Sequence, residues 1–252
     1  MTFRNCMVIP ASFDVCRAVR GDKVVRRTKE EAQATRERLL DAAEVLFQSQ
    51  GVSRTTLQQI AQEAGATRGA IYWHFKDKAD LFNAMMDRVT LPMDEGLRAV
   101  ANGGEQDAIA LLERGIMDAL RMATTDPRVR RVFEIASYKV EYTDEMSAVQ
   151  ARHSTGRGAC IDDFEKALRL AAVQARVKLA VPSATAALGL HALISGLMQD
   201  WLLMPENFDL LLEGRRLFRA YARGLGLPVD PAERASRASN KTRVRALAAN
   251  QP

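Results

Sequence analysis

The sequence has few of the residues that build disulfide frameworks and metal centres. It contains three cysteines and three histidines, and Cys6, Cys16 and Cys160 are too scattered for a zinc finger or a set of disulfides. His153 and Cys160 lie seven positions apart, which is a weak metal pattern without further ligands nearby. We therefore expect free thiols, no metal and no other cofactor.

Long apolar runs are missing as well. The most apolar stretch, residues 184–204, is interrupted by His191 and Asp200, whereas a membrane span needs about 20 apolar residues in succession. The N-terminal segment carries Arg17 and Arg20 where a signal peptide would have its apolar run. These two absences predict a cytoplasmic protein with no membrane partner.

Catalytic motifs are also absent. No Ser or Cys nucleophile stands at a known motif spacing, and there is no HExxH sequence, no P-loop and no dinucleotide fingerprint. We therefore expect no catalytic residues and a protein that is not an enzyme.

The positive charge lies at the two ends of the chain. The net charge is +5, of which residues 1–27 contribute +4 and residues 228–252 contribute +3, so the segment between them carries −2. Charged termini are usually solvated, so this surplus alone is weak support for a nucleic-acid partner. We expect residues 1–27 to be a flexible basic extension and residues 228–252 a disordered basic tail.

Apolar residues recur at spacings of three and four, with almost no strand pattern. This predicts an all-α protein, with a bend near Gly156 and Gly158 in its longest helical segment. The expected helices lie near residues 28–48, 57–64, 68–75, 77–100, 105–123, 127–139, 142–178, 183–203 and 208–225.

Residues 56–75 have the features of a helix-turn-helix unit. Thr56 and Gln59 fit a capping box, Gly65 ends the first short helix, and Thr67 caps the second. Ile71 and Phe75, four positions apart, face the neighbouring helices and leave the other faces of the second helix for a partner. An α-helix fits the major groove of DNA, which makes DNA the expected partner.

A family resemblance supports this interpretation. The segment RTKEEAQATRERLLDAAEVLFQSQGVSRTTLQQIAQEAGATRGAIYWHFKDKADLF resembles the DNA-binding domain of the TetR family, in particular AcrR-like repressors of multidrug efflux pumps. EMSAVQARH and LISGLMQDWLLMPENFDL resemble later segments of these relatives more weakly. The resemblance implies a three-helix DNA-binding domain at 28–76 and a helical ligand-binding and dimerisation domain at 77–227. Because it begins near residue 24, we expect Val24 to be the native start.

The resemblance and the helix geometry together assign DNA contacts. Arg68 suits base reading because a guanidinium can bond O6 and N7 of guanine together, and Gly69 keeps the helix surface low. Family matches place Tyr72, His74 and Lys78 on the phosphate backbone, although packing and solvated roles remain open for them, and we expect Trp73 to pack. Thr56, Gln58 and Thr67 would add hydroxyl, amide and helix N-terminal contacts.

The helices near 183–203 and 208–225 are apolar on more than one face. Gly189 and Gly196, seven positions apart, would permit the close approach of another helix. This pattern predicts a homodimer through these two helices. A buried central helix in a monomer is the alternative.

A ligand pocket is only loosely specified. Soft and aromatic side chains that suit irregular apolar ligands occur across the larger domain, although each could be plain core. The candidate set is Met86, Met93, Met117, Phe133, His153 and Trp201.

The expected function is a ligand-responsive repressor of an efflux pump operon. Small hydrophobic inducers would release it from a pseudo-palindromic operator. Two alternatives stay open at this point. One is a regulator or activator of a metabolic operon that responds to an acyl or aromatic metabolite, and the other is an architectural DNA-binding protein without an inducer.

Overall fold

The computed structural model of the chain describes the backbone of residues 16–101 and 107–230 and the side chains of residues 28–91 and 107–230. All regular structure in these ranges is helical, as predicted. The elements are α1 (Cys16–Gln50), α2 (Leu57–Glu63), α3 (Arg68–His74), α4 (Lys78–Ala101), α5 (Ala108–Thr125), α6 (Pro127–Tyr138), the 3-10 helix η1 (Asp144–Met146), α7 (Ser147–Ala175), α8 (Ser183–Leu203) and α9 (Leu210–Gly224).

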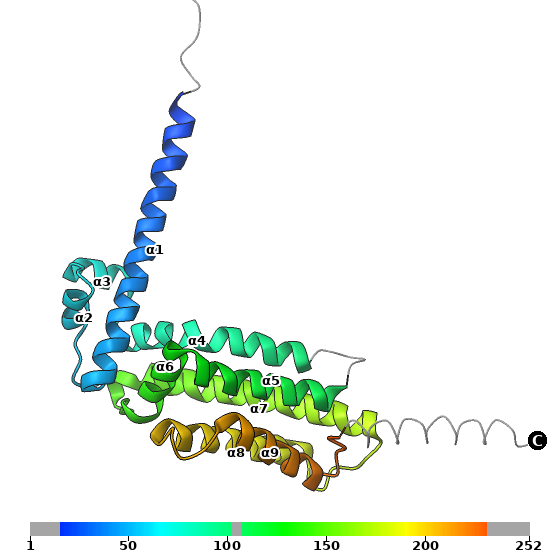
Figure 1. Cartoon of the computed structure of the whole chain (residues 1–252). Coiled ribbons are helices and arrows are strands. Elements are labelled where there is room, and N and C mark those ends of the chain that lie inside the picture. Colours follow the sequence, from blue (N-terminus) through cyan, green and yellow to red (C-terminus); the bar gives the residue numbers. More distant parts are fainter. Residues whose placement is uncertain (1–15, 102–106, 231–252) are drawn as a thin grey trace, which may run out of the picture.

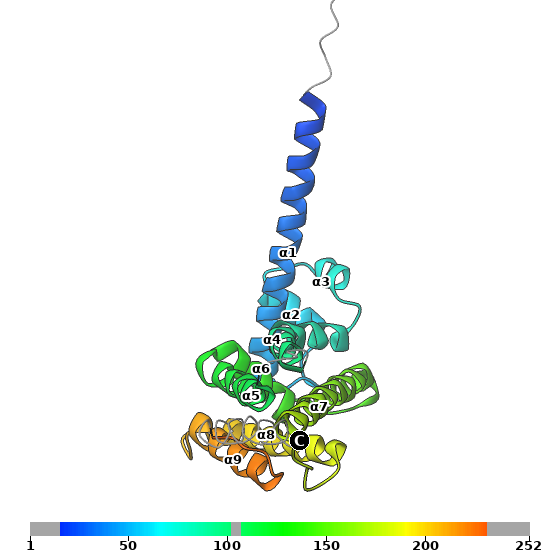
Figure 2. The same ribbon diagram turned by 90° about the vertical axis from the view of Figure 1, so that its right-hand side faces the viewer.

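The structure consists of the long helix α1 and a body of packed helices. α1 extends away from the other helices, and α2 and α3 pack beside its second half (Figure 1). Helices α4 to α7 lie below this unit, and α8 and α9 form the opposite edge of the body in both side views (Figure 2). α2 and α3 thus lie beside α1, and α8 and α9 lie along the side of the body that is farthest from α1 (Figure 1).

Capping interactions define the two short helices. The Thr56 hydroxyl accepts from Gln59 N at 3.2 Å, and Gln59 Oε1 accepts from Thr56 N at 2.8 Å, which completes the predicted capping box. Thr67 Oγ1 accepts from Ala70 N at 3.1 Å and caps α3. Gly65 has φ +62°, a conformation that favours glycine and lets the chain turn sharply between α2 and α3.

Two apolar clusters make up the core. The first joins α1, α2 and α3 to α4 and α6 through side chains such as Phe47, Ile71 and Phe82. The second joins α5, α7, α8 and α9, and Phe133 of α6 packs against both clusters. The boundary expected between residues 76 and 77 separates two segments of the chain, but side chains from both segments pack in the first cluster.

The structure differs from two expectations for chain segments. α1 begins at Cys16, within the expected extension, and no proline between residues 16 and 28 opposes the helix. Pro228 and Val229 are buried, and Val229 belongs to the second cluster, so the expected tail is not free from residue 228. α7 runs as one helix through Gly156 and Gly158, within the long helical segment that was expected. Residues 1–15 and 231–252 lie outside the described residues.

α8 is the one described helix that is long and apolar enough to cross a membrane by length and composition. Ala186, Ala187 and Leu190 on one of its faces are buried in the second cluster. This face belongs to the protein core.

Gly189 of α8 permits the close approach that its spacing suggested, and the neighbour is α9 of the same chain. A Cβ at this position would meet the hydroxyl of Tyr221, which donates to Ala186 O at 2.8 Å. Gly196 has nothing within 4 Å of such a Cβ among the described residues. The glycine at position 189 therefore keeps α8 and α9 in contact.

We predict that Gly189→Ala lowers the free energy of unfolding by about 1–3 kcal/mol, because the Tyr221 ring must move and lose its hydrogen bond. Gly156→Ala is the matched control, since its Cβ would meet no described atom within 4 Å. It should raise stability by about 0.5–1 kcal/mol through helix propensity. Urea denaturation at one protein concentration measures both, and equal stability of the two variants would contradict the packing role.

Candidate nucleic-acid interface

Two buried side chains fix the rotation of α3. Ile71 and Phe75 are buried in the first cluster, as their spacing predicted. The guanidinium of Arg36 from α1 lies 5.3 Å from the centre of the Phe75 ring and covers its outer side. Because residues 71 and 75 point inward, residues 69 and 73 lie on the opposite side of the helix. Arg68 and Tyr72 flank the inward face and are exposed at its edges.

The outward face of α3 presents one cation and two large rings. Arg68 is exposed, and its guanidinium carbon lies 5.9 Å from the centre of the Tyr72 ring, itself 51% exposed. Gly69 is also exposed, and among the described residues an added Cβ would meet only Thr67 Oγ1, at 3.9 Å. Packing within the chain therefore does not require glycine at position 69, whereas a partner that approaches closely would.

The expectation that Trp73 packs is wrong. Its side chain is 72% exposed, because Ile71 and Phe75 already occupy the inward face of the helix. The ring makes an edge contact with His74, with 4.6 Å between ring centres. Trp73 is thus accessible to a partner, and the inward spacing of residues 71 and 75 was the signal that predicts its exposure.

His74 ends α3 as a partly buried, uncharged group. Burial lowers the pKa of its imidazole below the ordinary value, and the nearby Arg36 guanidinium lowers it further. The neutral ring, which has one N–H donor, is therefore the favoured form near neutral pH. At this position it can donate one hydrogen bond to an acceptor beside the helix end.

The two cap residues and Gln58 surround the start of both short helices. Thr56, Gln58 and Thr67 are all exposed. The hydroxyls of Thr56 and Thr67 already accept from backbone amides in their caps. The Thr67 hydroxyl can donate its O–H to an acceptor on a partner while it caps α3, whereas the Thr56 O–H already donates to Gln59 Oε1 at 3.0 Å.

Lys78 differs from the other predicted DNA contacts. Its residue is 7% exposed, and Nζ donates to Ser53 O at 3.4 Å and lies 3.2 Å from Glu145 Oε2. An ammonium group in this position holds the loop before α2 and the 3-10 helix η1 against α4. Lys76, two residues earlier, is exposed and was not among the predicted contacts.

The predicted ligand residues do not gather around one cavity. Met86 and His153 line a hollow of about 20 Å³ between α4, α6 and α7, where Tyr142 Oη lies 3.3 Å from His153 Nδ1. Met117 and Trp201 are buried in the second cluster instead, and Phe133 bridges the two. Met93 lies in α4, but its side chain is outside the described residues. These residues therefore lie on different helices and helix faces and do not line one common cavity.

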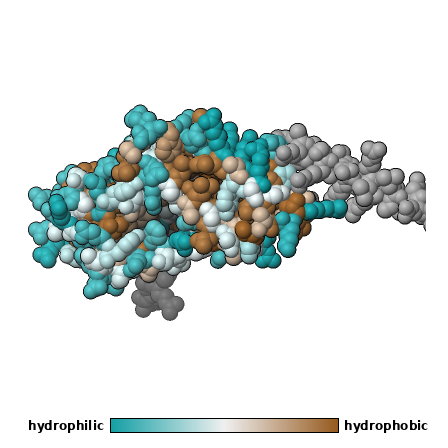
Figure 3. Space-filling view, turned by 90° about the horizontal axis from the view of Figure 1, so that it is seen from below, coloured by the Kyte–Doolittle hydropathy of each residue, from teal (hydrophilic) through white to brown (hydrophobic). Residues whose placement is uncertain are grey.

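Apolar side chains also gather on the outer surface of α8 and α9. The underside of the molecule, where these helices lie in Figure 1, shows large hydrophobic areas (Figure 3). The exposed apolar residues of this face, which we call the α8–α9 face, are Leu188, Leu203, Met204, Leu212 and Leu217. Such a concentration of exposed apolar groups is typical of an interaction surface.

Comparison with known protein families agrees with this geometry. Residues 39–85 match "Bacterial regulatory proteins, tetR family". Residues 107–226 match "MAATS-type transcriptional repressor, C-terminal region". The first match contains α2 and α3 in full, and the second extends from the segment before α5 to the end of α9.

Individual relatives cover most of the chain. The transcriptional regulator TtgR of Pseudomonas putida is 38% identical over 188 residues, which are 75% of this chain and 90% of TtgR. NalD of Pseudomonas aeruginosa, the secondary repressor of the MexAB-OprM multidrug efflux pump, has a crystal structure with a TM-score of 0.71 and 36% identity, covering 78% of this chain and 98% of NalD. The complex of SmeT with triclosan has a TM-score of 0.68 and 32% identity, covering 75% of this chain and 90% of SmeT. SmeT is the repressor of a Stenotrophomonas maltophilia multidrug efflux pump. These matches and the helix-turn-helix geometry show that the chain belongs to the TetR family of transcriptional regulators.

Proposed function

We propose that this protein is a cytoplasmic repressor of an efflux pump operon and that small hydrophobic inducers release it from its operator. The observation that carries the proposal is the outward face of α3, where Arg68, Tyr72 and Trp73 stand exposed on a rigidly packed helix. NalD and SmeT, which repress multidrug efflux pumps, support the efflux assignment, and the triclosan complex of SmeT supports a hydrophobic inducer.

In this proposal α3 enters the major groove. Arg68 reads a guanine, and Gly69 lets the helix backbone approach the base edges. Tyr72, Trp73 and the N–H of His74 contact the sugar-phosphate backbone beside the groove. Thr56, Gln58 and Thr67 contact phosphates at the starts of α2 and α3, where backbone amides and hydroxyls favour anions.

The operator is a pseudo-palindrome, because the functional unit in this proposal is a homodimer formed through the α8–α9 face. That face exposes several large apolar side chains, including Leu188 at 46%. Two copies would bury these side chains and present two α3 helices on one side of the DNA. Half-sites about one helical turn apart, or a multiple of a turn, fit such a dimer.

We predict that the protein binds its operator far more tightly than random duplex and that Arg68→Ala weakens operator binding by about 5- to 150-fold, since a bidentate base contact is worth about 1–3 kcal/mol. Fluorescence anisotropy on DNA upstream of the gene, with a random duplex as control and a panel of lipophilic drugs including triclosan, measures both. Equal losses on operator and random DNA would refute base reading by Arg68. Absence of preference for any upstream sequence would refute the proposed repressor.

Lys76 and Lys78 form a matched pair for a test of the phosphate contacts. We predict that Lys76→Met makes the slope of log affinity against log salt shallower by about 0.9, since one phosphate contact is lost. Lys78→Met should leave that slope unchanged and lower the free energy of unfolding by about 1 kcal/mol, because its partner Glu145 is exposed. Salt titrations of operator binding and urea denaturation decide between them. A shallower slope for Lys78→Met with unchanged stability would restore the direct contact first expected for Lys78.

The dimer has its own test. We predict that Leu188→Glu converts the protein to a monomer in light scattering after size exclusion, because a carboxylate would be buried between two copies of the α8–α9 face. Val173→Glu is the control, since Val173 of α7 is 74% exposed and lies outside that face. A monomeric wild type, or a Leu188→Glu variant that stays dimeric, would rule out this interface.

A further inference from the structure

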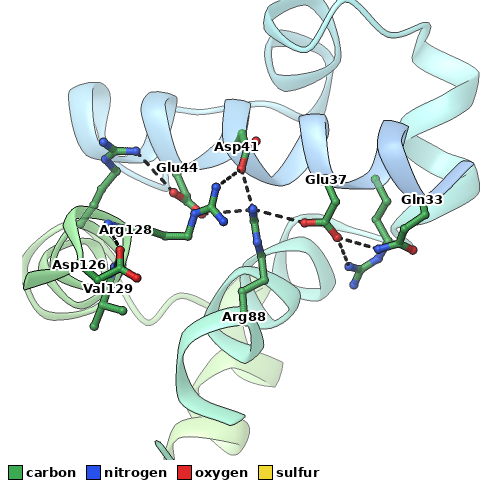
Figure 4. A network of polar contacts seen from close by, with 10 residues as sticks. Gln33, Glu37, Asp41, Glu44, Arg88, Asp126, Arg128 and Val129 are labelled. Carbon is green, nitrogen blue, oxygen red and sulfur yellow. Dashed lines mark hydrogen bonds and ion pairs between the residues drawn. The ribbon is translucent and has the colours of Figure 1, made fainter. Parts of the chain in front are cut away.

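A cluster of charged residues joins α1 to the body of the protein. Glu37, Asp41 and Glu44 are spaced four and three positions apart on α1 and therefore share one face of the helix. Three arginines face them. Arg88 of α4 and Arg128 of α6 are shown in Figure 4, and the third is Arg131 of α6. We call these six residues the Glu44 cluster.

Arg88 links all three carboxylates of the cluster. Its Nη2 lies 2.7 Å from Asp41 Oδ1 and 3.3 Å from Glu37 Oε2, and its Nη1 lies 3.2 Å from Glu44 Oε1. The side chain is only 13% exposed. This guanidinium therefore ties α4 to about two turns of α1.

The two arginines of α6 meet at Glu44. Arg128 Nη2 lies 3.0 Å from Asp41 Oδ1, and its Nε lies 3.6 Å from Glu44 Oε1. Arg131 Nη1 lies 3.5 Å from Glu44 Oε2. Both oxygens of one carboxylate are thus shared between α4 and α6, so Glu44 is the point where three helices are joined.

Glu44 is 1% exposed, which makes it one of the few buried charged residues in the described part of the chain. Burial raises the pKa of its carboxyl, while the Arg88 and Arg128 guanidiniums act in the opposite direction. A buried carboxylate is costly without partners, and removal of one partner of a buried pair is strongly destabilising. The arginines therefore cannot leave Glu44 without a large change in local energy.

α6 is also attached to α8. The guanidinium of Arg130 lies 5.2 Å from the centre of the Trp201 ring, and Tyr138 Oη donates to the carbonyl of Gln199. Arg128 and Arg131 are three positions apart and point to α1, whereas Arg130 lies on the other side. α6 is thus held between α1, which carries the DNA-reading unit, and α8, which belongs to the second cluster.

We infer that Glu44 is a positioning residue for DNA binding: through Arg128 and Arg131 it makes α1, and with it α3, follow any displacement of α6. A ligand that moves α6 then changes the position of both recognition helices in the dimer. This consequence for the operator rests on the proposed function, whereas the mechanical link between α6 and α1 does not.

The link can be tested without DNA or ligand by hydrogen–deuterium exchange of the full chain. In Glu44→Gln, amides of α2, α3 and the second half of α1 should exchange at least about tenfold faster, with α5, α7 and α8 unchanged. Glu113→Gln is the control, since Glu113 of α5 is only 13% exposed and pairs with two arginines of α9, with Arg219 Nε at 2.9 Å and Arg215 Nε at 3.6 Å. It should leave exchange in α1 to α3 unchanged.

Two exchange results would overturn the inference. Unchanged exchange in α1 to α3 of Glu44→Gln would mean that the apolar core alone positions the unit. Equally faster exchange in all helices would mean that Glu44 serves general stability. Glu44→Gln combined with Arg131→Gln should exchange like Glu44→Gln alone in α1 to α3, because both changes cut one link. Additive effects would refute a route through Arg131.

Operator titrations with triclosan as the probe test the functional consequence. Coupling of this kind typically changes affinity by about 5- to 150-fold. In Glu44→Gln the ratio of operator affinities without and with triclosan should be at least about fivefold smaller than in wild type, with triclosan binding to the free protein unchanged. An unchanged ratio would overturn the coupling role. A wild type that triclosan does not release would count against the proposed inducer, while the exchange experiment still decides the link.

Discussion

The DNA-reading helix depends on the burial of two side chains, Ile71 and Phe75. A helix of seven residues is not stable by itself in water, because it forms too few internal hydrogen bonds to offset its nucleation. α3 persists because these two residues enter the core shared with α1 and α2, and because Thr67 satisfies an amide at its start. The same constraint decides the function of the helix. With residues 71 and 75 fixed inward, Trp73 lies on the opposite side of the helix, and Arg68 and Tyr72 stay exposed at the edges of the buried face.

The core that holds α3 also contains residues of α4 and α6, including Phe82 and Val132. A movement of either helix therefore changes the support of the DNA-reading unit, even before charged contacts are considered. Apolar packing resists separation but permits small sliding, whereas charged hydrogen bonds are directional. The Glu44 cluster adds this direction, because the guanidiniums of Arg88, Arg128 and Arg131 fix where α1 sits along and around its axis. Packing and charge thus act on the same three helices.

Local rules made much of this structure predictable from the sequence. Capping residues and glycines placed the two short helices within one residue, because Thr56, Thr67 and Gly65 act on their own neighbours. Residues whose environment comes from distant segments were harder to predict. The position of Lys78 depends on Ser53 and Glu145, and the burial of Glu44 depends on arginines from α4 and α6. Trp73 was expected to pack, but Ile71 and Phe75 occupy the buried side of α3 and leave it exposed.

The predicted ligand residues were also hard to place from the sequence, for a further reason. The hollow beside Met86 and His153 holds about 20 Å³, about the room of one water molecule, whereas drug-sized ligands occupy pockets of about 300–1,000 Å³. A ligand that enters there must push α4, α6 and α7 apart, so its binding energy is partly used to move them. Two of these three helices, α4 and α6, carry the arginines of the Glu44 cluster. A preformed pocket large enough for the ligand would bind it without moving α4, α6 and α7. Binding of that kind would leave the positions of α1 and α3 unchanged.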